Sequence, residues 1–150
     1  MKLTNEIRKT EVYIMIKYTE EKTFTQDQVQ ELFKSVGWIS AEYPQRLYKA
    51  LMNSQTVLTA WDGERLVGLA RVLDDSELVA FVHYVLVHPE YQGRKIAGNM
   101  VEYIRDKYKN YLYIEGMPED SKNVAFYERH GFHVMEGGTP IQICNFSDKR

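Results

Sequence analysis

Hydrophobic positions along the chain follow two spacings, an alternating or continuous one typical of strands and a three-to-four spacing typical of helices. Apolar runs at 56–61, 66–73 and 79–87 predict three consecutive strands. The Asp62-Gly63 pair between the first two runs is typical of a tight hairpin turn. The middle of the chain is therefore predicted to form an antiparallel meander.

Helical spacing marks four further stretches. These begin at Thr25, Pro44, Ile96 and Asn123, with a polar N-cap or a first-turn proline at three of the four starts. Short strands are predicted at 14–18, 111–114, 132–135 and 141–146. The order of elements predicts one mixed α/β domain over residues 15–150, with a mostly antiparallel sheet and parallel crossovers at the helices. Residues 1–14 are predicted to be an N-terminal extension.

Composition narrows the class of protein. The chain has 150 residues and a net charge of −2, which disfavours a general nucleic-acid binder or a membrane-surface binder. No apolar stretch resembles a signal peptide or a membrane span, so no membrane partner is expected. Cys144 is the one cysteine, so no intramolecular disulfide and no cysteine-based metal site are expected. A reducing, cytoplasmic location fits this cysteine usage.

The stretch V-L-V-H-P-E-Y-Q-G-R-K-I-A-G carries the strongest chemical signal. A strand ends at Val87, and a loop with small residues, from Gln92 to Gly98, opens directly into a helix. Free backbone N–H groups and the positive end of the helix dipole make such a place suitable for a phosphate or pyrophosphate. The loop has neither a dinucleotide G-x-G-x-x-G nor a Walker lysine, so a nucleotide-binding domain is only a secondary interpretation.

A second signature, N-V-A-F-Y-E-R-H-G-F, begins at Asn123. Together with the loop it resembles the GNAT superfamily of acetyl-CoA-dependent N-acetyltransferases. The loop partly matches the superfamily pattern Q/R-x-x-G-x-G/A through Gln92 and Ala97, while Lys95 takes the place of the central glycine. The resemblance extends over residues 15–146 and includes A-W-D-G-E-R-L-V-G-L-A-R from Ala60. It is closest to small bacterial and plastid members.

The resemblance implies acetyl-CoA as the cofactor and assigns three groups of residues to it. Backbone groups of one strand would hold the pantetheine arm: Val85, Leu86 and Val87. The loop and the first helical turn would hold the pyrophosphate: Gln92, Gly93, Arg94, Lys95, Ile96, Ala97 and Gly98. The second signature would contribute Asn123, Phe126 and Tyr127.

The resemblance also suggests catalytic roles. The hydroxyl of Tyr127, with a pKa near ~10, would protonate the departing thiolate. The superfamily often places a carboxylate base on the fourth strand, where this chain has His83 and Tyr84. We take His83 as the expected base, with Tyr84, Glu115 or a water molecule as open alternatives.

The acceptor pocket is expected between the first two helices, the ends of the fourth and fifth strands and the last hairpin. Trp38, Tyr43 and Tyr84 would line it with aromatic rings, and Glu115 would lie beside it. Such a wall suits an aryl or alkyl amine. Glu42 and Glu77 would add a preference for cationic acceptors.

The fold implied by the resemblance is the GNAT fold, a twisted sheet of about six or seven strands with about four flanking helices, splayed between strands four and five. In the superfamily a bulge in strand four commonly accompanies the splay, and a bulge near Tyr84 would change which residues face the pocket, but the sequence does not give its position. The expected function is transfer of an acetyl group to the primary amine of a small molecule by direct attack in a ternary complex. A non-catalytic acyl-CoA sensor and a protein-lysine acetyltransferase remain alternatives, and the superfamily's frequent dimerisation allows a homodimer.

Overall fold

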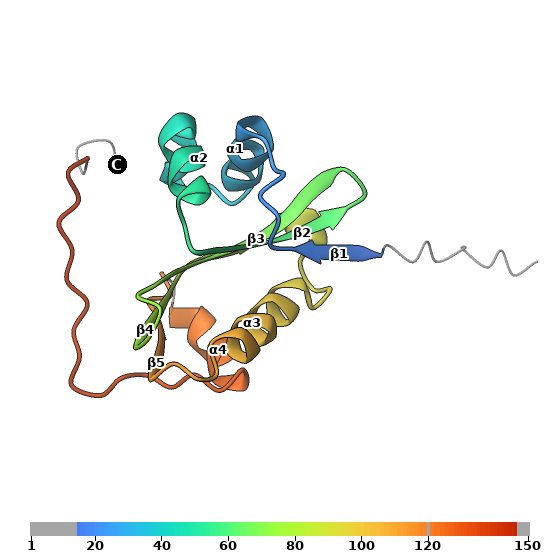
Figure 1. The fold of residues 1–150 in the computed structure, drawn as a ribbon. Coiled ribbons are helices and arrows are strands. Elements are labelled where there is room, and N and C mark those ends of the chain that lie inside the picture. The colour runs from blue at the N-terminus through green and yellow to red at the C-terminus, as the bar shows by residue number, and fades with distance from the viewer. Residues whose placement is uncertain (1–14, 120, 147–150) are drawn as a thin grey trace, which may run out of the picture.

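The computed structural model describes residues 15–119 and 121–146, which form a five-stranded sheet between two layers of helices (Figure 1). The strands follow one another in the sheet in chain order: β1 (Ile16–Thr19), β2 (Thr56–Asp62), β3 (Arg65–Asp74), β4 (Val79–Val87) and β5 (Tyr113–Gly116). Neighbouring strands are antiparallel except for β4 and β5, which are parallel. The expected extension, residues 1–14, lies outside the described residues.

The helices divide between the two faces of the sheet. One face carries α1 (Gln26–Ser35) and α2 (Pro44–Met52), joined by the 3-10 turn η1 (Ile39–Glu42), and the opposite face carries α3 (Ile96–Lys107) and α4 (Val124–Arg129) (Figure 1). Two further 3-10 turns precede α3 and α4: η2 (Pro89–Tyr91) and η3 (Ser121–Asn123). No helix within the described residues has the length and hydrophobicity needed to cross a bilayer.

Local sequence explains where the first elements begin and turn. The Thr25 hydroxyl accepts a hydrogen bond from the Gln28 N–H, and the Gln28 side chain accepts one from the Thr25 N–H, which completes a capping box at α1. Pro44 occupies the first turn of α2, where its missing N–H costs nothing. Gly63 has φ +57° in the β2–β3 hairpin, a conformation that favours glycine.

Two hydrophobic clusters lie on opposite sides of the sheet. One joins α1 and α2 to β2 and β3, with Leu32, Phe33 and Leu51 at its centre, and the other joins α3 to the reverse face through Met100 and Ile104. Because β2 and β3 are covered on both faces, their sequences are continuously apolar rather than alternating.

Gly68 in β3 sets how closely α3 approaches the sheet. A Cβ at this position would lie 3.2 Å from Ala60 Cβ and 3.2 Å from Ile96 Cγ2. Both contacts are tighter than packed side chains normally allow, so a side chain here would push Ile96 outward. Since Ile96 is the first residue of α3, the missing side chain of Gly68 fixes the position of the helix N-terminus.

The GNAT fold is confirmed in its sheet order and flanking helices, but the sheet has five strands among the described residues rather than six or seven. The strands predicted at 132–135 and 141–146 do not form. The C-terminal segment (residues 133–146) instead runs as an extended chain away from the sheet (Figure 1).

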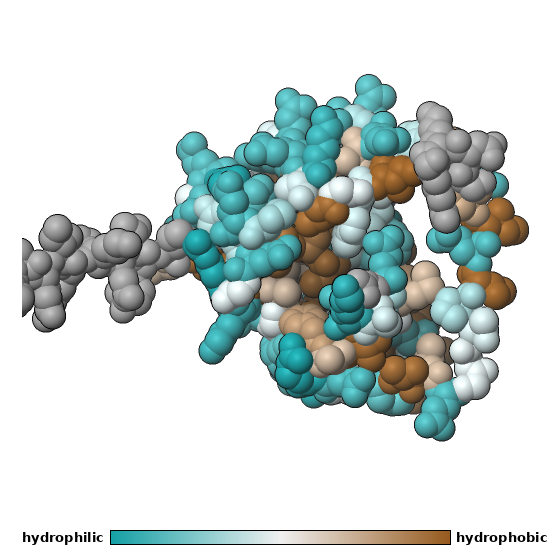
Figure 2. Space-filling model, turned by 180° about the vertical axis from the view of Figure 1, so that it is seen from behind, coloured by the Kyte–Doolittle hydropathy of each residue, from teal (hydrophilic) through white to brown (hydrophobic). Residues whose placement is uncertain are grey.

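The exposure of this segment explains the difference. Ile141 and Ile143 are 92% and 88% exposed, and Figure 2 shows the segment standing apart from the body. An isolated hairpin gains little stability in water unless one of its faces packs on other structure. The prediction that these residues form strands of the sheet is therefore wrong, although the segment is extended.

Candidate functional site

Strands β4 and β5 separate halfway along β4. Residues Val79 to Val82 pair with Tyr113 to Gly116, and β5 then ends while β4 continues to Val87. Beyond Val82, β4 keeps β3 as its neighbour on one side only. The splay expected between strands four and five is therefore present, and it leaves backbone groups of Val85 to Val87 without a strand on the β5 side.

A β-bulge accompanies the splay. Arg71 in β3 faces Tyr84, whereas the next residue, Val72, faces Val82, so His83 is the extra residue of β4. This bulge lies next to Tyr84, a position that the sequence alone does not give. It changes the alternation of β4 and brings His83 and Tyr84 beside Arg71.

The N-terminus of α3 lies close to the open end of β4. The Gln92 side chain donates a hydrogen bond from Nε2 to the Val87 carbonyl at 3.2 Å, which ties the loop to the end of the strand. Lys95 is the N-cap residue and makes no side-chain cap, so the first-turn N–H groups of α3 have no acceptor within the helix. These features fit a pyrophosphate group of coenzyme A.

Helix α4 is held against α3 by two close contacts. His130, just after α4, bonds through Nδ1 to Glu102 Oε1 at 2.7 Å, and this hydrogen bond lowers the pKa of the Glu102 carboxyl. Its ring packs over Gly98, where a Cβ would lie 3.2 Å from His130 Nε2. Gly131 has φ +89°, and a Cβ there would lie 2.9 Å from Arg105 Cζ. Gly131, the glycine of the second signature, is thus favoured by its left-handed backbone conformation and by the lack of room for a side chain.

Tyr127 and Asn123 are presented by this clamped helix. Tyr127 is partly buried against Phe126 and Phe132, with ring centroids 5.1 and 5.5 Å away. Burial raises the pKa of the Tyr127 hydroxyl, so it stays protonated at neutral pH. Asn123 occupies the N-cap position of α4 without a side-chain capping bond. No recorded ring contact or hydrogen bond between described residues joins Tyr127 to His83 or Tyr84.

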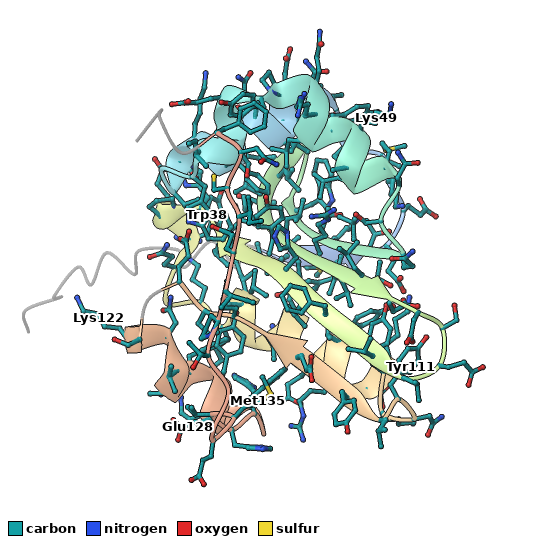
Figure 3. All side chains as sticks on the ribbon, turned by 90° about the vertical axis from the view of Figure 1, so that its left-hand side faces the viewer. Trp38, Lys49, Tyr111, Lys122, Glu128 and Met135 are labelled. Atoms are coloured by element: carbon teal, nitrogen blue, oxygen red, sulfur yellow. The ribbon has the colours of Figure 1, made fainter. Side chains whose placement is uncertain are left out.

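A cavity of about 210 Å³ lies on the other face, beneath α2. Its polar and aromatic lining comprises Ser40, Tyr43, Arg46, Arg71, Tyr84 and Phe146. The structure thus brings Tyr43 and Tyr84 together as expected. Trp38 packs on Tyr84, with the ring centroids 5.5 Å apart, but does not line the cavity. The C-terminal segment runs past Trp38 toward α2 (Figure 3). Glu115 faces Phe81 in the β4–β5 register and does not line the cavity.

His83 is held by Arg71. Its Nδ1 lies 2.8 Å from Arg71 Nη1, and because a guanidinium only donates, Nδ1 accepts this bond and Nε2 carries the proton of the neutral ring. Desolvation lowers the pKa of His83, and the positive charge of Arg71 lowers it further, although the residue remains exposed overall. The imidazole is therefore neutral at physiological pH.

The residues from 19 to 132 match the acetyltransferase (GNAT) family. The chain belongs to this family. Among its relatives is a protein of Prochlorococcus marinus named an uncharacterized N-acetyltransferase ycf52-like, 27% identical over 130 residues, covering 81% of this chain and 69% of that protein. A solved GNAT family acetyltransferase of Streptococcus pneumoniae TIGR4 superposes with a TM-score of 0.75 at 27% identity, covering 87% of this chain and 99% of the other. A probable acetyltransferase of Staphylococcus aureus superposes with a TM-score of 0.72 at 26% identity, covering 86% of this chain and 100% of the other.

Membership of the GNAT family supports acetyl transfer and implies acetyl-CoA as the acetyl donor. Two features of this GNAT protein fit the donor: the end of β4 without a β5 neighbour and the uncapped first turn of α3. Lys95, the departure from the family glycine, adopts the left-handed conformation with φ +63° that a glycine would adopt freely. The loop thus has the backbone shape expected of the motif without its usual residue.

Sequence reasoning missed the two arginines of the cavity, Arg46 and Arg71. The signal for Arg71 was present, because it is a charged residue inside the otherwise apolar run of β3. No such signal marks Arg46, which is one of two charged residues on α2. The acidic residues expected to favour cationic acceptors, Glu42 and Glu77, do not line the cavity.

Replacing Lys95 with glycine is expected to stabilise the protein by about 1 kcal/mol, because a side chain in the left-handed region is strained. Urea denaturation of the variant and the parent measures this directly. Ser76→Gly, at φ +71°, should also be stabilising.

The matched control is Glu64→Gly, in the β2–β3 turn, because Glu64 is not among the described non-glycine residues with positive φ. It should be destabilising, since glycine adds freedom to the unfolded chain. A loss of stability in Lys95→Gly as well would mean that the Lys95 side chain makes a stabilising contact that outweighs its strain.

Proposed function

We propose that this protein is an acetyl-CoA-dependent N-acetyltransferase that acetylates the primary amine of a small molecule by direct attack in a ternary complex. One observation carries the proposal: the open end of β4, the uncapped start of α3 and the helix that presents Tyr127 are fastened together. Gln92 fastens the first two, and His130 with Gly98 fastens the last two.

The donor would be held mainly by backbone. Val85, Leu86 and Val87 would add hydrogen bonds to the pantetheine arm, as a neighbouring strand would. The pyrophosphate would lie on the loop and first turn, whose members are Gln92, Gly93, Arg94, Lys95, Ile96, Ala97 and Gly98. Asn123 and Phe126 would border the arm from α4. The positive charges of Arg94 and Lys95 favour an anionic group there.

Bound acetyl-CoA would supply a thioester, whose acyl carbon forms the new C–N bond while its C–S bond breaks. The residues of the chain manage the protons. A base takes a proton from the acceptor ammonium, so that the neutral amine can attack, and the nitrogen gives up a second proton to solvent as the C–N bond forms. Tyr127, kept protonated by burial, gives its proton to the departing sulfur and recovers one from solvent. No nucleophile of the chain takes part, because the acceptor attacks directly.

We propose His83 as the base, with Tyr84, Glu115 and a bound water as alternatives. Its lowered pKa keeps the imidazole neutral at physiological pH, which a base requires. The Tyr84 hydroxyl is engaged with Ser40 Oγ at 2.7 Å, which makes it a weaker choice. Neither His83 nor Glu115 is among the residues that line the cavity, but His83 is adjacent to Arg71 and Tyr84, which do line it. The Arg71 bond to Nδ1 must loosen for His83 to accept a proton there.

The setting of the reaction is part of the proposal. A cytoplasmic location rests on the single cysteine, Cys144. A homodimer is supported by the exposed apolar residues of the C-terminal segment, and light scattering on the full chain should then return twice the monomer mass. A protein-lysine acceptor is the alternative, and we favour a small molecule because the proposed acceptor cavity has a volume of about 210 Å³.

Tyr127→Phe is expected to reduce kcat by about 100-fold or more, because it removes the proton donor while keeping the ring. Release of free thiol from acetyl-CoA, measured with a panel of amines, gives the rate. The KM for acetyl-CoA should change little.

Tyr103→Phe, on the exposed side of α3, is the matched control and should keep the parental rate. Full activity of Tyr127→Phe would remove the assigned acid. If the parent protein binds acetyl-CoA but acetylates no amine, the non-catalytic sensor would replace the enzyme.

The pH dependence of kcat/KM tests His83. Because the base must be unprotonated, kcat/KM should rise with pH through the pKa of His83, which lies below the ordinary value near ~6.5. His83→Gln should lack this rise and keep the separate rise that follows deprotonation of the acceptor ammonium. An unchanged profile in His83→Gln would transfer the role to another group, whereas His133→Gln should leave the profile as it is.

A further inference from the structure

Arg71 is a half-buried charge without a counter-ion. It lies in β3 at the bulge, and desolvation lowers the pKa of its guanidinium. Among residues 15–119 and 121–146, no carboxylate lies within salt-bridge distance of it. Proteins normally pair a desolvated charge with an opposite one. The lack of a carboxylate beside Arg71 among the described residues therefore needs an explanation.

The guanidinium is oriented by its neighbours. Its Nε donates to Ser54 Oγ at 2.8 Å, and that buried hydroxyl in turn donates to the Ala50 carbonyl at 2.7 Å. Its Nη1 donates to His83 Nδ1 at 2.8 Å, and the Tyr84 ring lies 5.6 Å from its Cζ. These partners are neutral, so they orient the charge without compensating it. Nη2 has no recorded hydrogen-bond partner among the described residues.

A second arginine faces the same cavity. Arg46 of α2 lines it, with Cζ 5.2 Å from the centre of the Phe146 ring. Across from Arg71, the Ser40 and Tyr84 hydroxyls form a polar pair. No aspartate or glutamate is among the residues that line the cavity. The cavity is thus strongly positive in a chain whose net charge is −2.

We infer that the acceptor of this enzyme is an amine that also carries an anionic group, a carboxylate or a phosphate, and that Arg71 with Arg46 binds that group. The inference rests on the proposed function and names its substrate class. A planar guanidinium fork binds either oxyanion through paired, charge-assisted hydrogen bonds. The same positive field opposes polyamines and other acceptors that carry additional positive charge.

Matched pairs of amines test the inference. Thiol release from acetyl-CoA is measured with 4-aminobutyrate against butylamine, and with phosphoethanolamine against ethanolamine. The two pairs distinguish a carboxylate from a phosphate. At least one amine that carries an anionic group should show a kcat/KM about 10-fold or more above that of its counterpart without the group, the range expected of a charge-assisted hydrogen bond.

Substitution of the arginines should remove this preference. In Arg71→Gln the kcat/KM values of the two amines of a pair should become nearly equal, mainly through a higher KM for the amine with the anionic group. Arg71→Lys keeps the charge but not the planar fork, so its preference should lie between those of the parent and of Arg71→Gln. Lys49→Gln removes the same charge from α2 outside the cavity (Figure 3) and should leave the preference intact. Turnover without an anion preference, or a preference that survives Arg71→Gln, overturns the inference and leaves the acetyltransferase proposal standing.

A binding experiment decides the question if no amine is acetylated. Phosphoethanolamine is titrated into the protein while the His83 ring is followed by NMR. An anion on Arg71 offsets the charge that lowers the pKa of His83, so this pKa should rise with the ligand in the parent protein and not in Arg71→Gln. An absent rise in the parent, or an equal rise in Arg71→Gln, rules out the anion site whatever the fate of the proposed function.

Discussion

The end of β5 at Gly116, while β4 continues to Val87, is the constraint on which the site depends. A sheet with full pairing would use every backbone group of β4 internally. Here the second half of β4 keeps one neighbour, and the bulge at His83 turns its side chains relative to β3. Two irregularities on opposite edges of β4 thus create the open strand end and the cluster of His83, Tyr84 and Arg71.

Packing on the two faces of the sheet then places the remaining groups. The missing side chain of Gly68 lets Ile96 reach the sheet, which brings the start of α3 to the end of β4. The missing side chain of Gly98 lets His130 lie on α3, which brings Tyr127 to the same side. Two glycines therefore fix the positions of the helix turn proposed to bind the pyrophosphate and of the proposed acid, Tyr127.

The order of elements up to Phe132 could be predicted from the sequence because it depends on local signals. Thr25 caps its helix, Pro44 opens the next one, and the Asp62-Gly63 turn follows an apolar run, each by physics that acts over a few residues. The prediction of the two final strands was wrong because strand pairing depends on a neighbouring strand, which hydrophobic periodicity does not reveal. Ile141 and Ile143 alternate as a strand would, yet they face solvent.

The residues proposed for the site differ in how clearly the sequence marks them. The proposed coenzyme loop and Tyr127 lie in contiguous motifs, so their residues could be named from the sequence. The proposed acceptor cavity is assembled from η1, α2, β3, β4 and the C-terminal segment, and Arg71 draws attention only when the bulge sets it beside His83. A single charged residue in a strand gives no indication of whether its counter-ion belongs to the protein or to a ligand.

Amide NMR with coenzyme A tests the central claim most directly, since it reports where the donor binds without requiring an acceptor. If the interrupted β4 and the start of α3 form the donor site, the largest shifts will fall on Val85 to Val87 and on Gln92 to Gly98, with smaller ones on α4. Shifts confined to other parts of the chain, or none at millimolar coenzyme A, would contradict the account.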